Sequence, residues 1–429
     1  MKLTRTARRA VAVGVAALAL ALSSCSVTGA GSGSKGEAGS GTGTINALFM
    51  KQAGYSESDV RQMISSFEKE NPKIKVKPTF VSYEALHDKI VTSAAAGTYD
   101  VELIDVIWPA EFASKGLIAD VTKRFPDSWK SEMLGGALNT AEYDHKYYGV
   151  PWGPSTKLFY YNSAMLKKVG ATPADLNTWS GVLDVARKLK RQGISQYPIS
   201  WSWAQAEALI CDYAQMLGAF GGSFTDGAGK LAVNNAAGVQ ALTWMKKTLD
   251  EGLTNPGSTT FLEDDVSKSM AQGDTAFSLN WDSTYRDLND PSISKIVGKN
   301  GVLPTPEGPT GQRPGVNGAM ALSIASRSKN QDAAWKLIEY LTSQPVQEKF
   351  IKSGASNWKA SFEKPEIVAT NKPVFDAYKT ALQSTILRPP VPGYNNISQA
   401  LQVELQNALL GKKTPQKALD DAVAAANKE

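Results

Sequence analysis

Short apolar runs alternate with helix-spaced apolar residues along the first third of the chain. Residues 45–50, 74–80 and 100–107 read as strands. A helix is expected after Ser58, which can cap it, because apolar residues recur there at helical spacing: Val60, Met63, Ile64 and Phe67. A second helix is expected over 83–96. This alternation predicts α/β layers around a largely parallel sheet.

A second alternation follows. Residues 158–162 are expected to form a strand, and 179–192, 205–220 and 235–250 helices. The Pro- and Gly-rich stretch 301–315 reads as a crossover. A strand is then expected at 319–325, a helix at 331–342, and two last helices at 398–410 and 415–425. Roughly 400 residues exceed what one hydrophobic core usually serves, so we expect two lobes.

The N-terminus has the pattern of an export signal. Basic residues from Lys2 to Arg9 precede an apolar run over 10–22 that is too short to span a bilayer. We expect a signal peptide at 1–24 and a flexible Gly/Ser linker at 25–43. The tetrad ending at Cys25 resembles a bacterial lipobox, which implies a lipid anchor on Cys25 at the outer face of a cell membrane. An ordinary signal peptide with a chance cysteine is the alternative.

Composition excludes several classes of function. The formal net charge of +5 comes mostly from the signal, so the chain lacks the basic footprint of a nucleic-acid-binding protein. Only two cysteines occur, and lipidation of Cys25 would leave Cys211 as a small buried hydrophobe without a disulfide partner. His87 and His145 are the only histidines and lack metal-ligand spacing, so we expect no metal and no cofactor.

No enzyme motif stands out. The sequence has no Gly-x-Ser-x-Gly elbow, phosphate loop or dinucleotide fingerprint. Asp264 and Asp265 with Glu251 could be read as the carboxylate pair of a glycosidase. A solvated or helix-capping role is favoured for Asp264 and Asp265.

Tryptophan is the positive signal, with ten copies. Trp179, Trp244 and Trp335 sit at helical positions and are taken as structural. Five others lie beside polar residues near expected strand ends, where α/β folds bind ligands. A sugar presents C–H groups on its faces and hydroxyls at its edge, so aromatic platforms beside planar polar groups favour a carbohydrate site. These five are Trp108, Trp152, Trp201, Trp203 and Trp281.

The chain from about Thr44 to its C-terminus resembles the extracellular solute-binding proteins of ABC sugar importers, and most of all their trehalose/maltose-binding branch. Asp105-Val-Ile-Trp108-Pro-Ala-Glu111-Phe112 looks like the segment "DV-W--EF" of that branch, and Tyr148-Gly-Val-Pro-Trp152 like its "Y-LP" segment. Asn280-Trp281 and Arg388-Pro-Pro-Val-Pro-Gly-Tyr394 also have counterparts.

The resemblance implies a two-lobed periplasmic-binding-protein-like fold of type II, with a ligand cleft between lobes joined by hinge crossovers. One lobe would comprise 44–152 and 311–357, the other 153–310 and 358–429. The implied function is that of a lipid-anchored, extracellular and monomeric receptor. It would deliver a di- or oligosaccharide to ABC permease subunits by lobe closure, without catalysis.

The resemblance also implies roles for single residues. Asp105 matches an acceptor for sugar hydroxyls, Tyr161 and Trp281 match aromatic contacts, and Arg388 matches a guanidinium that grips hydroxyls. Two departures stand out: Gln52 lies near the position of an acidic contact, and Asn317-Gly318-Ala319-Met320 replaces a Gly-Gly-Trp segment. The full set of expected ligand-binding residues is Gln52, Asp105, Trp108, Glu111, Trp152, Tyr161, Trp201, Trp203, Trp281, Asp282, Asn317, Arg388 and Tyr394.

Two other functions stay open at this point. An anchored glycoside hydrolase or lyase would share the aromatic cleft and use a carboxylate pair. A binding protein for a non-sugar solute, such as a peptide, polyol or osmolyte, would share the fold. The mixture of Asp, Asn, Gln and Arg with Trp favours hydroxyl-bearing ligands.

Overall fold

The computed structural model describes residues 41–51, 54–351 and 356–428. Four of the expected features lie wholly or mostly outside these residues: the signal peptide, the Gly/Ser linker up to residue 40, the lipidation site Cys25 and the candidate ligand contact Gln52. In the described part of the chain, no helix is both long and apolar enough to cross a membrane.

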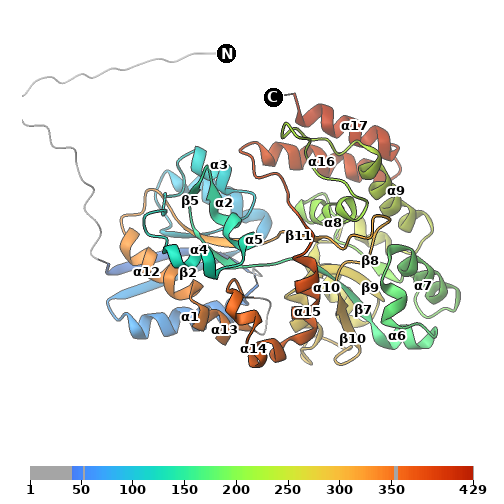
Figure 1. The fold of residues 1–429 in the computed structure, drawn as a ribbon, viewed down its shortest axis with the longest axis horizontal. Coiled ribbons are helices and arrows are strands. Elements are labelled where there is room, and N and C mark those ends of the chain that lie inside the picture. Colours follow the sequence, from blue (N-terminus) through green and yellow to red (C-terminus); the bar gives the residue numbers. More distant parts are fainter. Residues whose placement is uncertain (1–40, 52–53, 352–355, 429) are drawn as a thin grey trace, which may run out of the picture. The chain divides into compact units, whose positions relative to one another are not determined.

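One lobe is built on a five-stranded sheet of order β2-β1-β3-β12-β6 (Figure 1). β1 pairs in parallel with both β2 and β3, whereas β12 runs antiparallel to β3 and β6. Helices α1, α2 and α12 pack on this sheet, and we call this body the first lobe. Its strands are β1 (Gly43–Met50), β2 (Ile74–Val81), β3 (Val101–Asp105), β6 (Val150–Gly153) and β12 (Met320–Ile324).

The first lobe carries seven α-helices and a small hairpin in the described residues. The helices are α1 (Glu57–Glu70), α2 (Tyr83–Ala94), α3 (Pro109–Ser114), α4 (Asp127–Glu132), α5 (Gly135–Leu138), α12 (Gln331–Thr342) and α13 (Gln344–Lys349). The hairpin is formed by β4 (Glu142–Tyr143) and β5 (Lys146–Tyr147), and η1 (Asn139–Ala141) precedes it.

The second lobe is built on a four-stranded sheet of order β10-β7-β9-β8. β7 runs antiparallel to β9 and β10, and β8 is parallel to β9. Its strands are β7 (Lys157–Asn162), β8 (Ile199–Ser200), β9 (Phe277–Trp281) and β10 (Asn300–Leu303). Between the lobes, β11 (Gly315–Val316) pairs with β13 (Thr385–Ile386).

Helices surround the second sheet, with α10 packed on β9 and α15 on β10, while α8, α9, α16 and α17 pack together. They are α6 (Ser163–Lys168), α7 (Trp179–Arg191), α8 (Glu207–Ala219), α9 (Ala236–Asp250), α10 (Glu263–Gln272), α11 (Thr284–Leu288), α14 (Pro365–Thr370), α15 (Lys372–Ala381), α16 (Tyr394–Leu409) and α17 (Pro415–Ala426). Short turns of 3₁₀ helix are η2 (Pro173–Leu176), η3 (Pro256–Thr259) and η5 (Lys359–Phe362).

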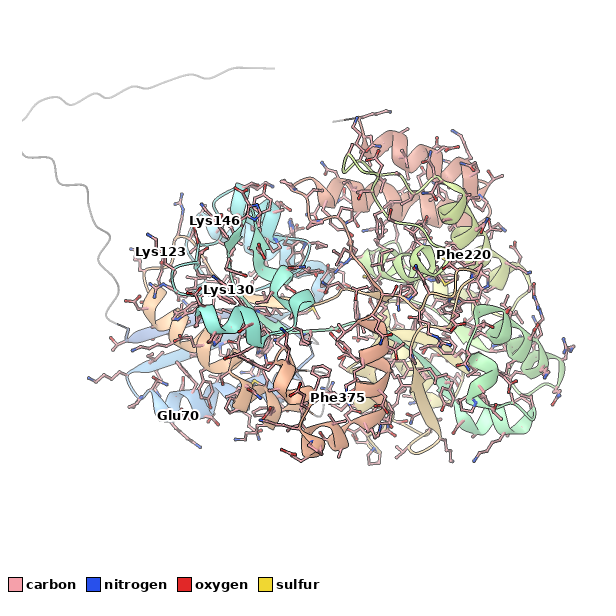
Figure 2. The ribbon with its side chains drawn as sticks, viewed as in Figure 1. Glu70, Lys123, Lys130, Lys146, Phe220 and Phe375 are labelled. Atoms are coloured by element: carbon pink, nitrogen blue, oxygen red, sulfur yellow. The ribbon has the colours of Figure 1, made fainter. Side chains whose placement is uncertain are left out.

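Each sheet has its own hydrophobic core. Leu48, Leu103 and Trp335 belong to the core of the first lobe. One face of the second sheet packs against α7, α8 and α9, and the other face contributes to a smaller cluster with α15. Phe375, which Figure 2 marks on α15, is fully buried and meets Phe362 edge to face. The two-lobed α/β architecture expected from sequence is confirmed, while the lobe boundaries stay predictions.

The three strands of the first alternation, β1, β2 and β3, pair in parallel as expected, but the complete sheet is mixed because β12 runs antiparallel to β3 and β6. Two other local expectations need correction. Ser56, not Ser58, caps α1 by accepting the backbone N–H of Asp59. The stretch 301–315 is also not all crossover, since β10 extends into it.

Glu102 makes the stability of the first lobe dependent on pH. Its side chain lies on β3, the residue is 1% exposed, and Oε2 has no hydrogen-bond partner among the described residues. Burial raises the pKa of Glu102 from 4.5 to about 8. The folded state therefore binds a proton on Glu102 more tightly than the unfolded chain does. The contribution of protonated Glu102 to the free energy of unfolding is complete below pH 4.5 and is lost as the pH rises through 8.

We predict that Glu102→Gln removes this loss. The difference in free energy of unfolding between the variant and the wild type should grow by about a few kcal/mol, in favour of the variant, as the pH is raised from 5 to 8.5. Urea unfolding at several pH values measures the difference. Glu363→Gln, at an exposed position, is the matched control. Parallel pH profiles for wild type and Glu102→Gln would refute the prediction.

Candidate functional site

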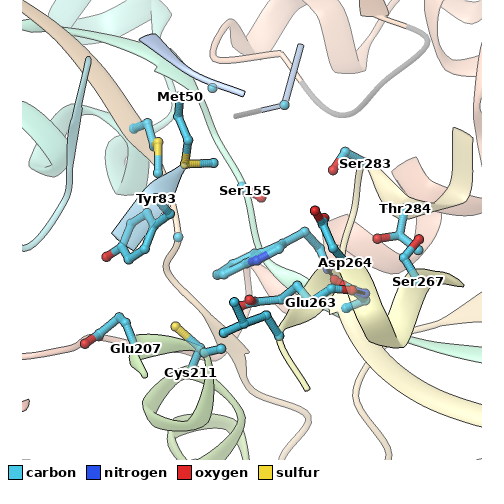
Figure 3. A pocket seen from close by; sticks show the side chains of 18 of the residues that line it. Met50, Tyr83, Ser155, Glu207, Cys211, Glu263, Asp264, Ser267, Ser283 and Thr284 are labelled. Atoms are coloured by element: carbon cyan, nitrogen blue, oxygen red, sulfur yellow. Dashed lines mark hydrogen bonds between the residues drawn. The ribbon is translucent and has the colours of Figure 1, made fainter. Parts of the chain in front are cut away.

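A cavity of about 380 Å³ opens between the strand ends of the two sheets. From the first lobe it is lined by the ends of β1 and β3 and the starts of β12 and α2, and from the second by α8, α10, α11 and the end of β9. Figure 3 shows Met50 and Tyr83 on one side, Ser267, Ser283 and Thr284 on the other, and Glu207 with Cys211 below.

Arg388 connects the two lobes at the wall of this cavity. Its guanidinium binds the Asp105 carboxylate in a two-point contact, Nη2 to Oδ1 at 3.0 Å and Nη1 to Oδ2 at 3.2 Å. Nη1 also donates to Oε1 of Glu207 at 2.9 Å, and Nη2 to the carbonyl oxygen of Asn317 at 3.1 Å. The Arg388 side chain is 1% exposed, so this cation is buried between two carboxylates.

Tyrosines hold both carboxylates in place. Tyr83, at the start of α2, donates its hydroxyl to Asp105 at 2.7 Å, and its ring stacks on Trp108. Tyr394, at the start of α16, donates to Glu207. Burial lowers the pKa of the Arg388 guanidinium, but Asp105 and Glu207 outweigh it and keep that pKa above its ordinary value. The guanidinium therefore stays charged while facing the cavity.

Trp281 forms an aromatic wall at the end of β9. A side chain at Gly318 would collide with the Trp281 ring, since a Cβ there would lie 2.2 Å from it. Glycine thus allows the backbone between β11 and β12 to lie flush against the indole. Asn280 fixes the local backbone, accepting the Trp281 N–H at 2.8 Å and donating to the carbonyl oxygen of Glu263 at 2.9 Å.

A fully buried lysine stands beside this wall. Lys157 is the cross-strand neighbour of Trp281, and its ammonium lies 5.3 Å from the indole centroid. Lys157 Nζ contacts Asp212 at 2.8 Å, Ser202 at 2.9 Å and Glu263 at 3.2 Å. Burial lowers the pKa of Lys157, but Asp212 and Glu263 outweigh it, so the pKa lies above its usual value. A charged network thus supports Trp281.

The structure brings three expected site residues together at the cavity: Asp105, Trp281 and Arg388. Tyr394 and Trp108 lie behind the wall, where each contacts a lining residue. Asn317 contributes its carbonyl oxygen to Arg388.

The remaining expected residues lie elsewhere. Trp152 packs on Phe49 and Tyr55 in the first core, and Trp201 stacks on Trp203 in the second, all three 1% exposed. Glu111 is ion-paired with Lys115 and lies 3.0 Å from a ring nitrogen of His87, and Asp282 accepts the hydroxyl of Ser155 at 2.6 Å. Tyr161 covers Gly301 on the neighbouring strand. Their roles in ligand binding stay predictions.

Sequence reasoning missed Glu207, Lys157 and Glu263. Each acts through a partner distant in sequence, so no local motif marks it. A charged residue at the start of an apolar strand, as Lys157 is in Lys157–Asn162, was the available signal. Cys211 is buried as expected, but it also lines the cavity.

The carboxylates considered for hydrolysis have other partners. Asp265 accepts the backbone N–H of Leu262 at the start of α10, which is the capping role favoured from sequence. Glu251 binds Arg187 at 2.8 Å through both carboxylate oxygens. Among the residues that the structure describes, no group of three or more His, Cys, Asp or Glu side chains could hold a metal ion.

We predict that Lys157→Met destabilises the protein by about 3–5 kcal/mol, because Asp212 would keep a buried charge without its partner. Lys157→Met combined with Asp212→Leu should recover more than half of that loss. Chemical denaturation of both variants and of Asp212→Leu completes a double-mutant cycle. A single-variant cost below about 1 kcal/mol would contradict the assigned network.

Comparison with known proteins places the chain. The family model described as bacterial extracellular solute-binding protein matches residues 38–348. A protein of Deinococcus radiodurans, named a probable ABC transporter-binding protein, is 29% identical over 343 residues, covering 76% of this chain and 79% of that protein.

Two solved structures share the fold over most of their length. The maltose-bound T. maritima MalE3 is 28% identical with a TM-score of 0.82, covering 90% of this chain and 99% of that one. A Thermotoga lettingae ABC transporter solute-binding protein bound with alpha-D-tagatose is 27% identical with a TM-score of 0.81, at the same coverage. Because the family model matches most of this chain, the chain belongs to the bacterial extracellular solute-binding proteins of ABC transporters.

Proposed function

We propose that the protein is the receptor of an ABC importer for a carbohydrate, which binds in the cavity between the lobes. The observation that carries this proposal is that Trp281, Asn280, Asp105 and Arg388 all line this cavity, with Asp105 from the first lobe and Trp281 from the second. An indole face packs against the C–H face of a pyranose, while carboxylate, amide and guanidinium groups bind its hydroxyls.

The size of the cavity favours a small sugar. Its volume of about 380 Å³ lies at the lower end of the range of roughly 300–1,000 Å³ for small-molecule sites. The fold is shared with proteins solved with maltose and with tagatose. A disaccharide of the maltose or trehalose type is therefore our first candidate, and longer oligosaccharides come second.

Departures from the trehalose/maltose-binding branch alter the first-lobe wall. Met320 stands in the segment where the branch has Gly-Gly-Trp, and Met50 lines the same side. Thioethers adapt to irregular ligands and contact aromatic or apolar surfaces. Ligand selection in this protein would therefore depend more on Trp281 and the second lobe.

Lobe closure would couple binding to transport. A sugar that touches Asp105 from one lobe and Trp281 from the other binds the closed state better than the open state, and so shifts the population toward closure. The closed form would dock on permease subunits as a monomer. A lipid on Cys25 would keep the receptor at the extracellular face of the cell membrane and raise its local concentration there.

Calorimetric titration with maltose, trehalose, maltotriose, tagatose and mannitol tests the proposal. We expect saturable binding of at least one sugar at micromolar affinity or tighter, with the sugar recovered chemically intact. Altered sugar after long incubation would indicate a glycoside hydrolase instead. No binding to any member would contradict the carbohydrate proposal and direct the search to amino acids and peptides.

For the sugar that binds, Trp281→Ala should weaken affinity by about 1–3 kcal/mol, because a central aromatic contact is lost. Titration of Trp129→Ala provides the control, since Trp129 packs against Trp335 and Trp358 away from the cavity. Equal loss in both variants would show a general effect of destabilisation. Unchanged affinity of Trp281→Ala would remove Trp281 from the site.

A further inference from the structure

The cavity has an excess of negative charge among its described wall residues. Seven carboxylate side chains line it, against three cationic ones. Glu84 and Asp105 come from the first lobe, and the other five from the second. The cationic residues are Lys268, Arg286 and Arg388.

The buried cations do not offset this excess. Arg388 lies between Asp105 and Glu207, so two negative charges surround one positive charge. Lys157, beside Trp281, likewise meets both Asp212 and Glu263.

At the rim, carboxylates face the cavity from both lobes. Arg286 pairs with Asp287 at 2.9 Å. Glu84 on α2 and Asp264 on α10 are exposed and line opposite sides of the cavity. Clefts lined by one sign of charge and bounded by low-dielectric walls focus the field and change local ion concentrations by about 10- to 1,000-fold.

We propose that the cavity selects solutes by charge: it rejects anionic sugars, admits neutral ones and favours sugars that carry an amine. That the ligand is a sugar rests on the proposed function, whereas the negative sign of the field follows from the residues that line the cavity. A uronic acid or a sugar phosphate would bring its charge next to carboxylates, whereas an ammonium group would find acceptors on either lobe. Like charges disfavour the wrong ligand without requiring any contact with the right one.

Cys211 provides a reporter of this field that needs no ligand. It lines the cavity one turn after Glu207 on α8 (Figure 3). In the full chain carrying Cys25→Ala it is the only thiol. Burial raises the pKa of the Cys211 thiol to about 12, which slows cationic and anionic thiol reagents alike, so the ratio of their rates reports the potential.

The experiment compares two methanethiosulfonates of similar size, one with a trimethylammonium and one with a sulfonate group. After normalisation to their rates with free cysteine, we expect the cationic reagent to modify Cys211 at least about tenfold faster, with a smaller ratio at high salt. Glu84→Gln with Asp264→Asn should lower the ratio severalfold, while Glu363→Gln should leave it unchanged. The variant Ser267→Cys in a Cys211→Ser background provides a second reporter. Ser267 also lines the cavity and is less buried than Cys211, and we expect the same preference for the cationic reagent there.

Titration with glucose, glucosamine and glucuronate, and with maltose and maltobionate, provides the ligand-based measurement. Anionic members should bind at least about tenfold more weakly than their neutral counterparts. Equal or faster reaction of the anionic reagent at both reporters, or equal binding of the anionic sugars, would overturn the charge filter even if neutral sugars bind. A preserved rate ratio without any sugar binding would instead overturn the proposed function and leave the filter standing.

Discussion

The buried guanidinium of Arg388 is the contact on which the rest of the site depends. Asp105 ends a strand of the first lobe and Glu207 begins a helix of the second, and Arg388 binds both carboxylates at once. Removing the cation would leave two buried acids facing each other across the lobe interface, which is strongly unfavourable. The same guanidinium lines the cavity, so the connection between the lobes and the recognition of a ligand use one group.

Helix α8 explains how the second lobe organises both ends of the cavity. Glu207 at its start fixes Arg388, while Asp212, little more than one turn later, fixes Lys157 beside Trp281. Ala208 and Cys211 lie between these acids and line the cavity itself. One helix therefore positions the guanidinium and the support of the aromatic wall, and a shift of α8 would disturb both together.

The sequence predicted the fold well because the periodic elements are long. Helix 331–342 and the apolar strands of the first lobe follow directly from spacing. For the site, three of the predicted residues do line the cavity: Asp105, Arg388 and Trp281. The other tryptophans show the limit: Trp201 and Trp203 stack in the core, because a polar neighbour in sequence does not reveal which way a large ring points. The partners of Lys157 and Glu207 were not predictable, since they lie tens to hundreds of residues away.

Small-angle X-ray scattering of wild type and Arg388→Met, each alone and with the sugar that binds most tightly, tests the central claim most directly. The claim is that one buried guanidinium joins the lobes and takes part in ligand-driven closure. It predicts that sugar lowers the radius of gyration of the wild type, and that Arg388→Met stays extended and binds the sugar at least about tenfold more weakly. Equal compaction and equal affinity in the two proteins would contradict it.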